Sequence, residues 1–190
     1  MPILATLALV VAALPAQVAD HSPRFDAVVR LAASPRNPLL TIAVRNDGRV
    51  LRSVDAGASF SETPLAVAPG PSVVEFDHGG VVYISDGSRR IHVSVDSGAT
   101  WTIRMIPGTS GAVGAIAGNP HRPLEVWAGI SAGRLFRSSD AGASWVEIGP
   151  RLGSAIRSIA LDPDDPDDVT FTDQSVITSQ SARQVSLARG

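Results

Sequence analysis

The stretch Ser94-Val-Asp96-Ser-Gly98-Ala-Thr100-Trp101 decides the fold, because the chain contains it in three copies. The shared pattern is Ser-x-Asp-x-Gly-x-Ser/Thr-aromatic, and its aspartates stand 41 and 44 positions apart. A period in this range predicts a repeat architecture, in which each repeat is one structural unit. The residues that carry the pattern are Ser53, Asp55, Gly57 and Phe60 in the first copy, Ser94, Asp96, Gly98 and Trp101 in the second, and Ser138, Asp140, Gly142 and Trp145 in the third.

Each copy lies between two short apolar runs, which predicts a β-hairpin whose turn is the copy itself. The aspartate can accept backbone N–H bonds inside the turn, and the glycine can adopt a positive φ without a Cβ clash. The closing Phe or Trp is a large apolar anchor for a neighbouring sheet. These roles are complete without a substrate, so we interpret the three aspartates as structural. The alternative, three metal-binding or catalytic carboxylates, requires them to converge, and a repeat spreads them apart.

Strand-like runs recur around each copy, with four strands and three turns per repeat, as in one blade of a propeller. The sequence therefore predicts an all-β fold, a β-propeller-like array of about four four-stranded blades with an irregular last blade. The last blade is expected to be irregular because a decayed copy around Ser181 has lost the Asp and the Gly. The blades are expected at about residues 25–66, 72–107, 112–150 and 154–190, within a domain that spans residues 20–190.

The repeated motif resembles the Asp-box, or BNR, repeat. That family includes sialidases, sortilin-like receptors, xyloglucan-active glycosidases and a photosystem assembly factor. The resemblance implies a β-propeller with the box between the third and fourth strands of each blade. Because the family is functionally mixed, the resemblance indicates the fold much more than an activity.

Composition indicates which kinds of partner, covalent chemistry and cellular location to expect. The 190 residues carry a formal net charge of −2, which gives no reason to expect a nucleic-acid partner. Cysteine is absent, so the chain has no disulfide framework and no thiol nucleophile. Residues 1–19 are apolar from Ile3 to Leu14, which predicts a signal peptide, a secreted or periplasmic protein and no membrane span once the signal is removed. The alternative is an apolar segment that stays attached.

Candidate catalytic groups do not assemble into a mechanism. Glycoside hydrolysis needs two carboxyl groups across one bond. The sequence does not pair any two of Glu75, Asp77, Glu125 and Glu147. We therefore predict no catalytic residue, although Glu75 is expected on an inner strand near the propeller axis. The acidic run at residues 162–168 could hold calcium, but its prolines favour a solvated loop.

The four histidines fall in separate units without metal-ligand spacing, so we predict no metal site and no cofactor. His92 aligns with Leu51 and Phe136 of the other repeats, which predicts a half-buried position on a strand.

Arginine recurs where the third strand of each repeat begins, at Arg49, Arg90 and Arg134. Three guanidinium groups on one rim could bind a carboxylate-bearing partner. The alternative is a solvated edge copied with the repeat. The sequence favours a non-catalytic, exported propeller that binds a protein, a peptide or an acidic glycan, with possible homo-oligomer formation through the last blade. The alternatives are a sialidase-like glycoside hydrolase, or a fragment of one, and a photosystem-type assembly factor.

Overall fold

The structure is a computed structural model that describes residues 28–69, 73–108, 110–149, 151–162, 164–165, 169–173 and 185–186. The strands of the first blade are β1 (Val28–Ala33), β2 (Thr41–Arg45), β3 (Arg49–Ser53) and β4 (Ser61–Ala66). Those of the second are β5 (Val74–Phe76), β6 (Val82–Ser85), β7 (Arg90–Ser94) and β8 (Thr102–Met105). Those of the third are β9 (Val113–Gly118), β10 (Val126–Ile130), β11 (Leu135–Ser138) and β12 (Val146–Ile148). The fourth contains β13 (Ile156–Leu161), β14 (Val169–Asp173) and β15 (Val185–Ser186).

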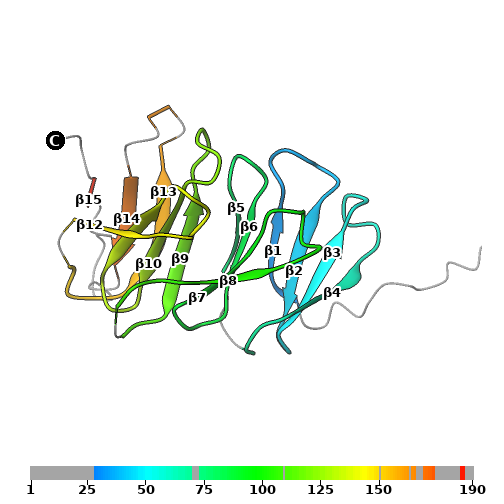
Figure 1. The fold of residues 1–190 in the computed structure, drawn as a ribbon, viewed down its shortest axis with the longest axis horizontal. Coiled ribbons are helices and arrows are strands. Elements are labelled where there is room, and N and C mark those ends of the chain that lie inside the picture. The colour runs from blue at the N-terminus through cyan, green and yellow to red at the C-terminus, as the bar shows by residue number, and fades with distance from the viewer. Residues whose placement is uncertain are drawn as a thin grey trace, which may run out of the picture.

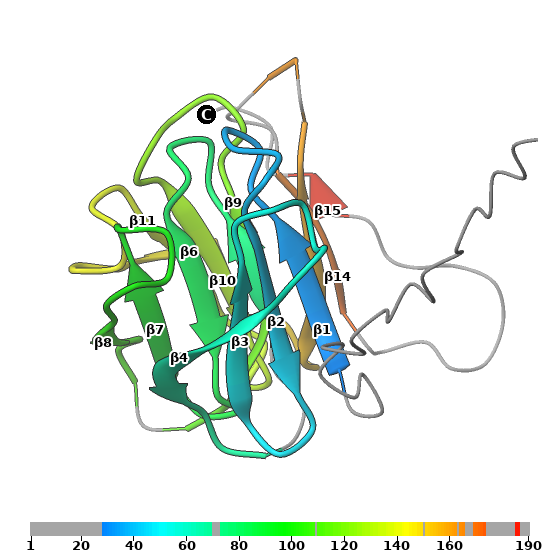
Figure 2. The ribbon, with the colours of Figure 1, turned by 90° about the vertical axis from the view of Figure 1, so that its right-hand side faces the viewer.

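Each sheet is an antiparallel meander in which every strand pairs with the next one along the chain. Figure 1 shows the sheets side by side in a row, from the first blade at one end to the fourth at the other. Figure 2 looks onto the first blade and shows the second behind it, with strands running in similar directions. The first strands of successive blades, β1, β5, β9 and β13, lie next to one another and form the inner side of the array. The predicted all-β propeller of about four blades is confirmed.

The fourth sheet has three strands in the part of the chain that the structure describes, in the order β13-β14-β15. The decayed copy around Ser181 lies outside the described residues. So do the expected signal peptide at residues 1–19 and the segment at residues 20–24 that could pair with the last blade. Among the described residues there is no helix with the length and apolar character of a membrane span.

The core lies between adjacent blades, because alternate residues of a strand point to opposite faces of its sheet and so reach different neighbours. Val82 and Ile84 of β6 pack with Val44 and Val50 of the first blade. Tyr83, which lies between them in sequence, packs instead with residues of the third blade. A separate cluster joins the third and fourth blades. The second and third blades thus each bury two faces against their neighbours.

The three repeated turns share the hydrogen bonds among their Ser, Asp, Gly and Ser/Thr residues, described here for the second copy together with its own indole bond from Trp101. The buried Ser94 hydroxyl donates to Oδ1 of Asp96 at 2.7 Å and accepts the N–H of Gly98 at 2.8 Å. The N–H and hydroxyl of Thr100 donate to Oδ1 and Oδ2 of Asp96 at 2.8 and 2.5 Å. Gly98 has a φ of +85°, and Trp101 donates its indole N–H to the Gly98 carbonyl at 3.2 Å. The aspartates thus have structural partners inside their own turns.

These hydrogen bonds give the turns a pH dependence. Bonds from Thr100 and Ser94 lower the pKa of Asp96 to about 2, and equivalent bonds do the same for Asp55 and Asp140. A carboxyl group with a depressed pKa stabilises the fold above its unfolded pKa, near 4, and this contribution is lost as the pH falls toward 2.

We therefore expect Asp96→Ala to lower the Tm by a few degrees at pH 7. As the pH falls toward 2, the wild-type carboxyl group becomes partly protonated, and the difference between the two proteins should become smaller. Thermal melts at several pH values test this. A Tm that Asp96→Ala leaves unchanged at pH 7 would show that the turn does not need its carboxylate.

Candidate binding groove between the first two blades

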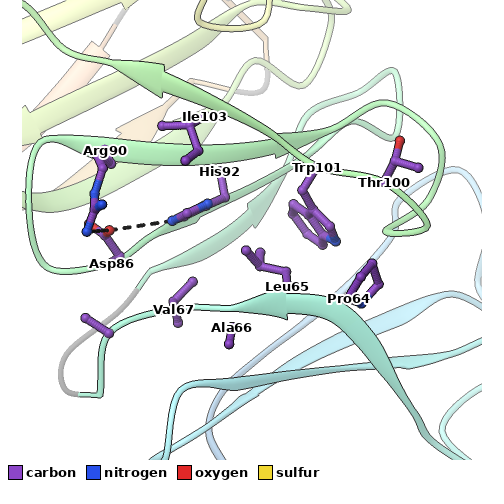
Figure 3. Close-up of a pocket in the computed structure, with 11 residues that line it drawn as sticks. Pro64, Leu65, Ala66, Val67, Asp86, Arg90, His92, Thr100, Trp101 and Ile103 are labelled. Atoms are coloured by element: carbon purple, nitrogen blue, oxygen red, sulfur yellow. Dashed lines mark ion pairs between the residues drawn. The ribbon is translucent and has the colours of Figure 1, made fainter.

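A groove with a volume of about 470 Å³ opens between the outer strand of the first blade and the outer strands of the second (Figure 3). We call it the β4–β8 groove. Its residues come from β4 and the segment after it, from the β6–β7 turn, from β7 and β8, and from the β7–β8 turn. They are Pro64, Leu65, Ala66, Val67, Ala68, Asp86, Arg90, His92, Thr100, Trp101 and Ile103.

The groove exists because the outer strands of the two blades do not close on one another. Arg90 and His92 lie on the face of β7 that points toward the first blade, and Ile103 of β8 pairs with His92 in register. Ile103 stays 54% exposed although it lies on this inward face. Figure 3 shows Trp101 beside Leu65 and Pro64 at one end of the groove, and the polar group at the other. One wall and one end are therefore apolar.

The corresponding position between the second and third blades contains a larger side chain. Phe136 of β11 stands where His92 stands in β7, and it is only 1% exposed. Arg134 lies over its ring at 4.9 Å from the centroid and is bound to Glu147 of β12. His92 is smaller than Phe136, and Ile103 cannot form the ion pair that Glu147 forms. The second blade thus has His92 and Ile103 where the third blade has Phe136 and Glu147, and this difference leaves space between the first two blades.

Asp86 forms the polar end of the groove, with a side chain that is only 1% exposed. Its carboxylate accepts the N–H of Ser88 at 3.0 Å and the Ser88 hydroxyl, and it pairs with Arg90 at 2.7 Å. Burial opposes ionisation of Asp86, but the Ser88 bonds and the Arg90 charge outweigh it and hold its pKa below the usual value. Asp86 is therefore a carboxylate at neutral pH, and its charge is balanced by Arg90.

His92 lies next to this pair with a side chain that is more than nine-tenths buried. Its Nε2 is 3.5 Å from Oδ2 of Asp86, which is too long for a good hydrogen bond. Neither ring nitrogen has a hydrogen-bond partner among the described residues. Burial lowers the pKa of His92 in spite of the nearby Asp86 charge, so the ring is neutral at pH 7. A neutral imidazole offers one donor and one acceptor to a bound molecule.

The groove has the chemistry of a binding site. Among the described residues that line it, Asp86 alone carries a carboxyl group, whereas glycoside hydrolysis requires two. Two other carboxylates with candidate roles are engaged in the fold. Asp77 accepts bonds from Val81 and Leu124 and from the Tyr83 hydroxyl. Glu125 is bound by Asn119, Trp127 and Arg137. Both contribute to holding their blades together.

The predicted arginine rim occupies equivalent positions, at or just before the start of a third strand. Each member has an acidic partner: Arg49 pairs with Glu62 at 2.5 Å, Arg90 with Asp86, and Arg134 with Glu147. Only Arg90 lines the β4–β8 groove. These pairs reduce the positive field of the rim, and its binding role stays a prediction.

The sequence did not single out His92 as a site residue, and the structure places it at the base of the groove. The sequence did contain one signal, since a histidine stands where the other repeats have Leu51 and Phe136. The side chain is more buried than the half-buried position that this alignment predicted. Leu65 and Ile103 carried no such signal, because they become wall residues only when two blades are placed together.

Comparison with solved structures shows the fold. The structure of YCF48 bound to D1 peptide matches with a TM-score of 0.60 at 15% identity, over 78% of this chain and 48% of that one. YCF48 from Cyanidioschyzon merolae matches with a TM-score of 0.59 at 15% identity, over 78% and 50%. The GH74 xyloglucanase from Xanthomonas campestris matches with a TM-score of 0.61 at 16% identity, over 77% and 27%.

The aligned part of the chain thus spans about half the length of the YCF48 structures and about a quarter of the xyloglucanase. Neither a known family profile nor a curated protein sequence matches this chain. At these identities the likeness establishes a shared propeller repeat fold and leaves the activity open.

Proposed function

We propose that this protein is a non-catalytic β-propeller that binds a peptide segment of another protein in the β4–β8 groove. The observation that carries the proposal is a groove with an apolar wall and a buried polar end whose histidine has no hydrogen-bond partner among the described residues. Such a site can take an apolar side chain and hydrogen-bond to the adjacent peptide group. One of the similar folds, YCF48, has been solved with a D1 peptide, which supports this class of ligand.

The charge at the groove favours a peptide over an acidic glycan. Asp86 and Arg90 neutralise one another, so the polar end presents no unbalanced positive charge. The groove is lined by Leu65 on one side, by Ile103 on the other and by the half-buried Trp101 at one end, and these residues suit an aliphatic or aromatic side chain (Figure 3). Burying one such side chain is worth about 1.5–3 kcal/mol, enough to determine which peptides bind.

The proposal predicts that Ile103→Asp weakens peptide binding by about tenfold to a hundredfold, because it places a charge in the apolar wall. The fold should survive, since Ile103 is 54% exposed. Peptides would be selected from a displayed random library on the wild-type protein, and their affinities would then be measured for both proteins.

The matched control is Val146→Asp. Val146 is also an exposed apolar residue on the outer strand of a blade, at 63%, and it lies outside the groove. The control should bind the selected peptides as the wild type does. Equal weakening by both changes would contradict the groove as the site. Hydrolysis of an aryl glycoside that is abolished by changing one carboxyl group would overturn the non-catalytic proposal.

A further inference from the structure

A second cavity, of about 350 Å³, lies on the inner side of the array, where β1, β5 and β9 meet. Ala32 and Ala33 of β1 and Gly118 of β9 form part of its walls, and Glu75 of β5 contributes a carboxyl group. None of the residues that line this cavity lines the β4–β8 groove, so the two sites are separate.

The fold does not use the Glu75 carboxyl group. Neighbouring Asp77 also lines the cavity, but its oxygens accept bonds from Val81, Tyr83 and Leu124. Glu75 forms no ion pair with an Arg or His of the described chain. Burial raises its pKa to about 7, and only the N–H of Phe76 opposes that effect. Glu75 is half-buried, and a carboxylate that is partly removed from water without a cation is unfavourable, so the site favours a group that brings a positive charge.

The walls limit what that group can be. Ala32, Ala33 and Gly118 are small, and together with two prolines they give the cavity an apolar surface beside the Glu75 carboxyl group. An organic cation on an aliphatic stem complements both parts, because the stem contacts the walls while the charged head reaches the carboxylate. We propose that the Glu75 cavity binds the cationic head of a basic side chain, an alkylammonium or alkylguanidinium group. The proposal does not depend on the function of the groove.

Binding of the cation should be coupled to the loss of a proton from Glu75. The cation requires the charged form of Glu75, so its binding expels the proton that Glu75 holds near pH 7. Affinity should therefore rise by up to about tenfold per pH unit below pH 7 and level off above it. The other titratable groups that line the cavity are Asp77 and His78, both from the segment that follows Glu75. The lining residues of β1 and β9 are not titratable.

The test uses two probes, n-butylammonium and n-butylguanidinium chloride, with sodium chloride at equal ionic strength as the reference. The pKa of the Glu75 carboxyl group is followed by its carbon chemical shift during a pH titration of the full chain. At saturation, one probe or both should lower this pKa by at least about one unit, and Glu75→Gln should not bind the probes. The probe that binds more tightly identifies lysine or arginine as the natural source of the cation.

His78→Ala separates the contribution of the neighbouring imidazole, and this variant should still bind the probes with Glu75 as the titrating group. Neutral n-butanol should leave the pKa unchanged. A Glu75 pKa that responds to both probes no more than to sodium chloride would overturn the proposal. So would equal probe binding by Glu75→Gln, which keeps the shape of the side chain and therefore separates loss of charge from loss of fold.

Discussion

Gly118→Val is expected to destabilise the protein by about 3 kcal/mol or more, which lowers the Tm of a domain of this size by roughly 6–12 °C. A Cβ atom at Gly118 would lie 2.5 Å from Cα of Asp77 and 2.5 Å from the carbonyl oxygen of Phe76. Both contacts are with backbone, so no side-chain rotation relieves them. The inner strands β9 and β5 would have to separate, which disturbs the packing of the second blade against the third.

Gly153→Val is the matched control, since a Cβ atom at Gly153 meets nothing within 4 Å. Its expected Tm is close to that of the wild type. Thermal and urea unfolding of both variants would measure the difference. If Gly118→Val were as stable as Gly153→Val, the close contact between the two inner strands would be wrong, and with it the arrangement of the blades.

His92→Phe is expected to raise stability and weaken peptide binding in the β4–β8 groove. Phenylalanine already occupies the corresponding position in the third blade, at Phe136, where it is 1% exposed. The substitution removes two buried ring nitrogens that lack hydrogen-bond partners, which favours folding. It also fills part of the groove, so peptides selected on the wild type should bind at least about tenfold more weakly.

The same variant should change the pH dependence of stability. The pKa of His92 is lowered by burial, so the unfolded chain takes up a proton at a higher pH than the folded protein does. The stability that neutral His92 contributes is therefore complete above its unfolded pKa, near 6.5, and is lost as the pH falls below that value. His92→Phe should remove this loss. A variant that keeps full peptide affinity would show that the groove is not the binding site.

The repeated turn made the fold predictable. The Asp-x-Gly turns occur at a spacing that accommodates one unit of four strands, and the structure places each turn between the third and fourth strands of a blade. Glu75 was expected on an inner strand, and it lies on β5. Both predictions depend on local pattern, since turn chemistry and strand alternation act within a few residues of the chain.

The groove could not be predicted in the same way. Leu65 and Ile103 are far apart in the sequence, and they line one groove from opposite sides only because the outer strands of the first two blades do not pack against each other there (Figure 3). The polar end depends on burial as well. In the sequence, Asp86 looks like an ordinary turn residue. Its place at the polar end of the groove follows only from its contact with Arg90 and from the neighbouring His92. Such features arise from packing between repeats, which a repeat pattern does not encode.

The most direct test of peptide binding in the groove is the NMR signal of two indole N–H groups during a peptide titration. Trp101 lines the groove and donates its indole N–H to Gly98, whereas Trp127 lies in the third blade and donates to Glu125. A library-selected peptide should shift the Trp101 signal in a saturable manner and leave the Trp127 signal in place. A peptide that binds with full affinity while the Trp101 signal stays unchanged would contradict the account.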